Sequence, residues 1–142
     1  MGNLSETREE TGPVRLRTPR SPGCLRVMRV VLGGVASRHD LPVDALDDID
    51  LAVETLLAGE PPAGGHLELT VNVTQGTYRL CLAGLRSQAT RKMLAPGSAS
   101  PQLRNGGPLD VRRILESLVD SFSVEERPGD TFTVCLEKRV PK

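Results

Sequence analysis

Aromatic residues are almost absent from this sequence, which contains no tryptophan, one tyrosine and two phenylalanines among its 142 residues. A hydrophobic core must therefore be built mainly from Leu, Val and Ile, and the 38% of hydrophobic residues suffices for a single core. Single-stranded nucleic acid is bound by stacking its bases on exposed aromatic rings, so this class of function is not expected.

Net charge is also lacking, because 18 Lys and Arg are balanced by 18 Asp and Glu. A neutral chain has no overall field that would attract nucleic acid or an anionic membrane, so neither partner is predicted. No run approaches the ~20 apolar residues that cross a bilayer, and the polar start Met1–Arg20 has no apolar centre of a secretion signal. The sequence predicts a cytoplasmic protein.

Cysteine and histidine are scarce and show no motif. The cysteines are Cys24, Cys81 and Cys135, an odd number with wide spacing and no CxxC or Cys/His cluster. This pattern argues against a disulfide framework and against a zinc site, so reduced and mostly buried thiols are expected. His39 and His66 have no matching Cys or Asp motif, so no metal site and no Cys/His catalytic pair is predicted.

The N-terminal part of the chain changes character after its first dozen residues. Residues 1–12 are polar and charged, which predicts a flexible tail, and residues 13–142 are predicted to form one domain. Val14–Arg17 alternates apolar with basic residues, a pattern typical of a short strand at the edge of a sheet.

Two amphipathic helices are predicted next. Ser21 and Pro22 supply an N-cap and a first helical position, and this helix runs to about Arg38 or His39. The second helix opens at Leu41–Pro42 and ends near Gly59. Its apolar stripe consists of Val43, Leu46, Ile49, Val53 and Leu56.

The second half of the chain predicts mainly strands. From His66 apolar and polar residues alternate, which indicates an antiparallel hairpin with its turn at Gln75–Gly76. Residues 84–108 contain three prolines and several glycines, so a long irregular lid is predicted. A third amphipathic helix around Val111–Val119 and a second hairpin close the chain.

This order of elements predicts an α+β fold. The simplest way to bury all the apolar stripes is a two-layer sandwich, in which a mixed, mostly antiparallel sheet is covered on one face by three helices.

Two stretches of sequence resemble motifs of a known family. Asp50–Ala58 resembles its second-helix box, in which a Glu is followed four residues later by an Asn that holds Mg²⁺. Ile114–Asp120, with the strand and Pro-Gly-Asp-Thr turn after it, resembles its C-terminal third. Over roughly residues 13–138 the chain resembles the bacterial anti-sigma-factor serine kinases of the gyrase and histidine-kinase ATPase superfamily.

The resemblance implies a histidine-kinase-type ATPase fold, a homodimer, and two kinds of partner, which are a sigma factor and an anti-anti-sigma protein. It also gives a reference against which the nucleotide site can be compared, and this chain departs from it. Glu54 stands at the position of the catalytic base, but Ala58 replaces the Mg²⁺-holding Asn and offers no oxygen to a hard cation.

Two further parts of the family's nucleotide site are altered. The segment around Gly84 has no acidic residue where the family's Asp-x-Gly-x-Gly box contacts adenine. Leu109 and Val111 stand where the family has glycines that approach the phosphates, and Asp110 would repel them. We therefore expect a pseudo-kinase with a degenerate ATP site, Glu54 as a remnant, and neither a nucleotide cofactor nor a bound metal.

Four arginines are candidate contacts for a protein partner. Arg26 and Arg29 lie near the start of the first helix, where the family uses an arginine to contact partners, and Arg86 and Arg91 lie in the predicted lid. The competing interpretation is that these charges are simply solvated.

The first functional hypothesis is an anti-sigma-factor-like transcription regulator that acts by binding protein. One alternative is an active serine kinase of anti-anti-sigma partners, in which lid residues replace the missing ligands. Another is a non-enzymatic scaffold subunit whose sheet face or first-strand edge pairs with an unrelated protein.

Overall fold

The structure is a computed structural model that describes residues 12–62, 64–95 and 110–140. The predicted tail up to residue 11 and residues 96–109 of the predicted lid lie outside the described residues. The elements are β1 (Val14–Pro19), α2 (Cys24–Arg38), α3 (Val43–Ala58), β2 (His66–Thr74), β3 (Thr77–Leu85), α4 (Gln88–Leu94), α5 (Val111–Leu118), β4 (Ser121–Arg127) and β5 (Thr131–Arg139).

The five strands form one sheet in the order β1-β2-β3-β5-β4, and every neighbouring pair is antiparallel. The predicted mostly antiparallel sheet is therefore confirmed, and among the strands described it is antiparallel throughout. The reason is that α2 and α3 carry the chain along the sheet and back, so β2 starts at the end where β1 stops, with Pro19 opposite His66. The predicted edge position of the first strand is confirmed.

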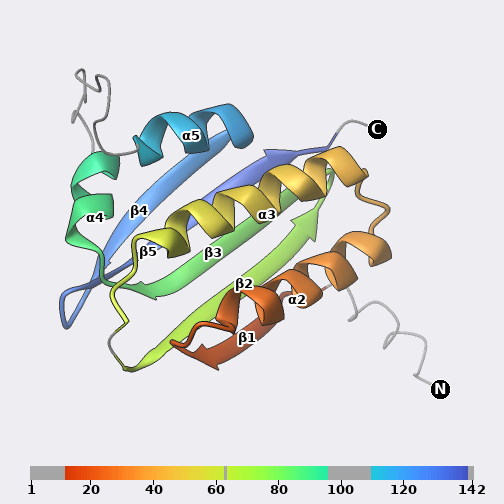
Figure 1. The fold of residues 1–142 in the computed structure, drawn as a ribbon. Coiled ribbons are helices and arrows are strands. Elements are labelled where there is room, and N and C mark those ends of the chain that lie inside the picture. Colours follow the sequence, from red (N-terminus) through yellow and green to blue (C-terminus); the bar gives the residue numbers. More distant parts are fainter. Residues whose placement is uncertain (1–11, 63, 96–109, 141–142) are drawn as a thin grey trace.

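The apolar core lies between the sheet and the helices. Figure 1 shows α2, α3 and α5 across one face of the sheet, which confirms the predicted two-layer α+β sandwich. Alternate residues of each strand point into this layer, because side chains of a strand alternate between faces. Fully buried examples are Leu69, Leu82 and Val134, and the hydroxyl of buried Tyr78 donates a hydrogen bond to the Leu32 carbonyl at 3.1 Å.

Two details of the predicted helices need correction. α2 begins at Cys24 with Gly23 as its N-cap, whereas Ser21 was predicted as the N-cap and Pro22 as the first helical residue. The Ser21 carbonyl accepts from the Cys24 N–H in a turn before the helix. In α3, Val43 was assigned to the apolar stripe but is 70% exposed, because it lies in the first turn, whereas Ala45 and Ala52 are buried. The predicted end of this helix at Gly59 is confirmed.

The predicted irregular segment 84–108 is partly ordered, and a fourth helix lies within it. α4 follows β3 after two residues, and the Ser87 Oγ caps it by accepting from the Thr90 N–H at 3.2 Å. Thr90 and Leu94 are buried. Because α4 has only seven residues and two of them are buried, the helical pattern of apolar residues in its sequence is too short to be recognised.

The expectation of three reduced thiols was also wrong. Cys81 on β3 and Cys135 on β5 lie opposite each other in register and form a disulfide, whereas Cys24 is free and buried. The two bonded residues are 54 positions apart, so only the pairing of β3 with β5 brings them together. No helix among the described residues has the length and apolar character needed to span a membrane.

Candidate functional site

The second half of α3 carries the residues that resemble the family's helix box. Glu54 is exposed on the side of α3 that faces α2, and its Oε1 accepts a hydrogen bond from Arg29 Nη2 at 2.6 Å. The two side chains are 49% and 45% exposed, so this ion pair contributes less than about 1 kcal/mol to stability. Ala58, one helical turn further on, is exposed and offers only a methyl group.

A cleft of about 440 Å³ lies between the start of α2 and the end of α3. Glu54 and Ala58 both line this cleft, together with the apolar side chains of Leu25 and Leu57. The structure thus brings two of the predicted site residues together. Within the described chain, no group of three His, Cys, Asp or Glu side chains is placed to hold a metal ion.

The other predicted positions lie elsewhere. Gly84 has φ +95°, and a Cβ atom at this position would lie 2.6 Å from the His66 carbonyl oxygen, so the backbone itself requires glycine there. Val111 is the buried first residue of α5, and the Asp110 carboxylate caps this helix by accepting from the Arg113 N–H. Leu109 lies outside the described residues.

The end of the cleft is closed by a buried ion pair that sequence analysis missed. Arg20 Nη1 contacts Glu60 Oε1, and the two side chains are only 5% and 6% exposed. Arg20 Nη2 also donates to the Gly84 carbonyl at 2.6 Å. Glu60 lies in a Pro- and Gly-rich loop, and nothing in its local sequence distinguishes it from a solvated charge.

Glu60 also binds the chain directly after β3. Its carboxylate accepts hydrogen bonds from the backbone N–H groups of Arg86 and Ser87, each at 3.0 Å. These two amides precede α4, where the positive end of a helix favours a negative charge. A carboxylate of the protein itself therefore occupies the donors that follow the second hairpin strand.

The four candidate arginines are not brought together. Arg26 and Arg29 lie on α2, whereas Arg86 and Arg91 belong to the segment around α4. The Arg86 guanidinium donates to the Gly64 carbonyl at 3.3 Å, and Arg91 forms an ion pair with Glu126 of β4. Their roles in binding a partner stay predictions, and the α2 pair is the more accessible because both residues are exposed.

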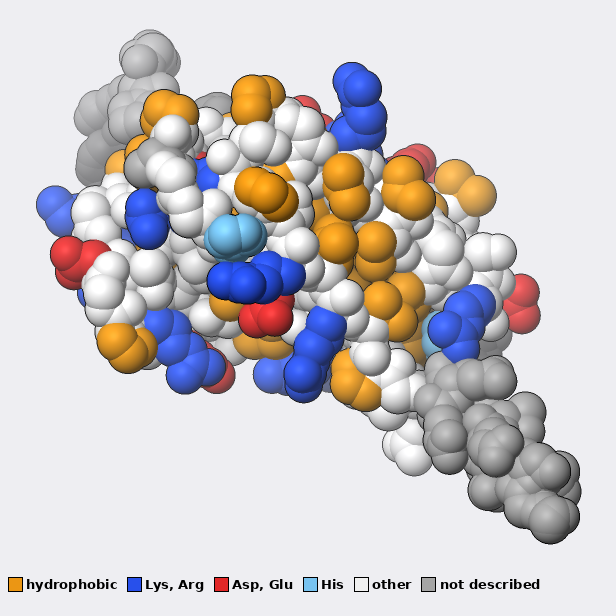
Figure 2. Space-filling model, turned by 90° about the horizontal axis from the view of Figure 1, so that it is seen from below, with side chains coloured by type: hydrophobic (Ala, Val, Ile, Leu, Met, Phe, Trp, Pro, Cys, Tyr) orange, Lys and Arg blue, Asp and Glu red, His pale blue; other side chains and the backbone are white. Residues whose placement is uncertain are grey.

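Apolar side chains are exposed beside these two arginines. Val27 and Val30 of α2 are 44% and 72% exposed. Figure 2 views the molecule from the side of β1 and α2, and it shows apolar side chains gathered with basic ones around them. We refer to Arg26, Val27, Arg29 and Val30 as the α2 surface.

Comparison with known proteins supports the fold. No family model matches the sequence, and no curated protein matches it significantly. The structure is similar to that of the RsbU and RsbW domains of Rv1364c from Mycobacterium tuberculosis, with a TM-score of 0.63 and 13% identity over 92% of this chain. The match covers 32% of the chain in that structure, so this chain spans about a third of its length.

A second similar structure is the SiaB–SiaC complex from Pseudomonas aeruginosa, with a TM-score of 0.49, 10% identity and 96% coverage of both chains. Identities this low show similarity of fold alone. The similarity to the Rv1364c structure thus supports the predicted α+β fold, and the resemblance to anti-sigma-factor kinases in function stays a prediction.

The buried ion pair yields a first prediction. Glu60→Gln leaves the Arg20 guanidinium without a counter-charge and weakens the acceptor for two backbone amides, so it should lower the free energy of unfolding by about 3 to 5 kcal/mol. Urea unfolding followed by circular dichroism measures this change. Glu54→Gln is the matched control, and it should cost less than about 1 kcal/mol because its ion pair is exposed. Equal effects of the two substitutions would contradict the assignment.

Asp50 in α3 yields a prediction about pH. Burial raises the pKa of its carboxyl above the ordinary value; Arg29 opposes this shift and Asp47 adds to it. Its Oδ1 is buried and has no hydrogen-bond partner in the part of the chain that the structure describes. The folded state thus holds this proton to higher pH than the unfolded chain, and the stability linked to it is lost as pH rises through the folded pKa.

Asp50→Asn removes this ionisation, so it should raise the free energy of unfolding at pH 7, and the gain should shrink towards about pH 4, near the ordinary pKa of Asp. Urea unfolding at both pH values tests this. Asp44→Asn, at an exposed position in the first turn of α3, should show no such gain. An Asp50→Asn variant that is no more stable than the parent at pH 7 would refute the prediction.

Proposed function

We propose that the protein is an anti-sigma-factor-like transcription regulator that acts by binding other proteins and does not need ATP. The observation that carries the proposal is that the residues at the predicted nucleotide positions, at the end of α3 and in the segment after β3, do not fit Mg-ATP. Supporting observations come from the end of α3, from the loop after β3, and from the α2 surface.

The end of α3 lacks a ligand for the metal. Magnesium is held by oxygen atoms in near-octahedral geometry, and Ala58 has no side-chain oxygen. Glu54 stands at the position of the catalytic base, and its carboxylate forms an exposed ion pair with Arg29 at 2.6 Å. Both features favour a remnant of a catalytic site over a working one.

The loop after β3 lacks the acidic residue that would contact adenine in the resembled family. Glu60 fills this region instead, because its carboxylate takes the N–H groups of Arg86 and Ser87. A nucleotide entering here would have to displace a buried ion pair, and replacing such a pair leaves a charge uncompensated.

The α2 surface supports binding of a protein. Exposed apolar side chains beside arginines are typical of interfaces, where arginine is enriched among residues that dominate the binding energy. We assign this surface to contact with a sigma factor, and we include in the proposal a homodimer and an anti-anti-sigma partner, which the sequence resemblance implies. The scaffold alternative shares the surface but predicts an unrelated partner.

The proposal predicts that the protein does not bind Mg-ATP. Isothermal titration at up to about 1 mM nucleotide should give no binding heat. The Kd would then be weaker than about 1 mM, which means a binding free energy of less than ~4 kcal/mol in magnitude. Ala58→Asn restores one oxygen ligand and should still give none, because Glu60 continues to occupy the loop after β3. Micromolar binding by the parent protein would exclude a degenerate site.

The kinase alternative has its own test, which is transfer of phosphate from ATP to a partner protein. It would be established if the parent protein transferred phosphate and the Glu54→Gln variant did not.

The proposal also predicts the effect of reversing a charge on the α2 surface. Arg26→Glu should weaken binding of a sigma factor captured from the native cell by at least about tenfold, because the variant repels an acidic contact that the parent attracts. Surface plasmon resonance measures the change. Arg113→Glu on α5 makes the same change of charge at another exposed helical position and should have little effect. Capture without any sigma factor would favour the scaffold alternative.

A further inference from the structure

The disulfide between Cys81 and Cys135 lies on the face of the sheet that the helices do not cover. On β3 the neighbours of Cys81 along the strand, Leu80 and Leu82, are buried in the core, so Cys81 points the opposite way. Val134 and Leu136 flank Cys135 in the same manner on β5. Neither sulfur belongs to the apolar core cluster.

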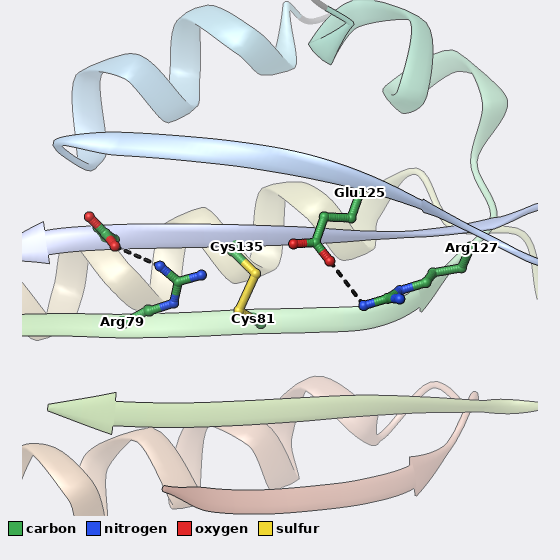
Figure 3. Close-up of a disulfide and its surroundings, with 6 residues drawn as sticks. Arg79, Cys81, Glu125, Arg127 and Cys135 are labelled. Carbon is green, nitrogen blue, oxygen red and sulfur yellow. Dashed lines mark hydrogen bonds and ion pairs between the residues drawn. A yellow bond between two sulfur atoms is a disulfide. The ribbon is translucent and has the colours of Figure 1, made fainter.

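The surroundings of the disulfide are polar and open. It lines a depression of about 460 Å³ on the sheet, whose other side chains include Thr70 and Thr133. Figure 3 shows it bridging β3 and β5 between two ion pairs. One joins Arg79 to Glu137 at 2.7 Å and the other joins Arg127 to Glu125 at 2.9 Å. Solvent and small solutes can therefore approach the Cys81 sulfur from this face without any opening of the core.

The sheet does not need this bond to keep its register. β3 and β5 pair through backbone hydrogen bonds from Thr77 opposite Arg139 to Ala83 opposite Thr133, on both sides of the cysteines. Cys24 cannot interfere, because it is buried on α2 on the other side of the sheet. Reduction should therefore convert one folded state into another, with no third thiol to reshuffle the bond.

We propose that Cys81 and Cys135 form a reversible redox site, which low-molecular-weight thiols reduce and their disulfides re-oxidise while the protein stays folded. This inference does not rest on the proposed function. It assigns to the open face of the sheet a chemistry of thiol–disulfide exchange that is separate from the cleft between α2 and α3.

The reduction proceeds in two exchanges. A small thiolate attacks the Cys81 Sγ, the bond between the two protein sulfurs breaks, and Cys135 leaves as a thiolate that takes up a proton. A second small thiolate then attacks the sulfur of the first, and Cys81 leaves as a thiolate that is protonated in turn. The two electrons come from the small thiols, which end as a disulfide, and oxidation is the reverse of these steps.

Cys81 is the sulfur that should be attacked, because access controls which sulfur reacts. Cys81 is partly exposed, whereas Cys135 is only 5% exposed. An attacking sulfur must approach along the line of the breaking bond, on the side away from Cys135. On that side lies β2, where Thr70 is the residue opposite Cys81 and has a small side chain.

A redox titration of the folded protein tests the proposal. The protein is equilibrated in native buffer with mixtures of reduced and oxidised dithiothreitol, quenched with acid, alkylated after unfolding and weighed by mass spectrometry. One alkylated cysteine is expected in the oxidised state and three in the reduced state, with one two-electron transition between them. The circular dichroism of the two states should agree. Reduction only where the protein has unfolded, or failure of the reduced protein to re-oxidise, would overturn the proposal.

Single variants test the assignment of the attacked sulfur. With glutathione disulfide, Cys135→Ser, which leaves Cys81, should form a mixed disulfide at least about tenfold faster than Cys81→Ser, which leaves Cys135. Equal rates would overturn the assignment of Cys81. Cys24→Ser is the matched control, and it should leave the midpoint of the redox titration unchanged because Cys24 lies on the other side of the sheet. A shifted midpoint would show that Cys24 takes part in the exchange and would refute the assignment to Cys81 and Cys135 alone.

Discussion

The buried contact between Arg20 and Glu60 is the constraint on which the arrangement around the cleft depends. With side chains only 5% and 6% exposed, neither charge can be satisfied by water, so each requires the other. Arg20 follows β1, Glu60 follows α3, and their hydrogen bonds reach the Gly84 carbonyl near the end of β3 and the N–H of Ser87 before α4. One ion pair thus joins the ends of β1 and α3 to the short segment between β3 and α4, three places that are distant in the sequence.

The same contact bears on what the site can bind. The Glu60 carboxylate already accepts from Arg20 and from the backbone N–H groups of Arg86 and Ser87. Because these donors are engaged, they are not open to a nucleotide in this loop. Ala58 adds no ligand at the end of α3, and Glu54 is turned towards Arg29. Among the described residues, the end of α3 therefore offers one carboxylate paired with an arginine and no neighbouring oxygen ligand, and the proposed degenerate site is based on this arrangement.

The parts of the fold that sequence analysis predicted well are those with local causes. α3 ends at Gly59 as predicted, and the hairpin turns at Gln75–Gly76, where the positive φ of Gly76 is one that glycine adopts readily. The missed features depend on long-range pairing: the Cys81–Cys135 bond needs the register of β3 with β5, and the Arg20–Glu60 contact needs two loops to meet. In the candidate site, the proximity of Glu54 and Ala58 could be predicted, because the two residues lie one turn apart on the same helix and line the same cleft.

The two surfaces of interest lie on opposite sides of the sheet, and Tyr78 is the link between them. It lies on β3 on the side away from Cys81, and its hydroxyl donates to the Leu32 carbonyl of α2. Burial raises the pKa of this hydroxyl, with a smaller contribution from Asp50, so it stays a donor at neutral pH. Because β2 and β5 both pair with β3, breaking one disulfide leaves the position of Tyr78 determined by the backbone. The redox chemistry proposed for the open face and the partner binding proposed for the α2 surface therefore do not depend on each other.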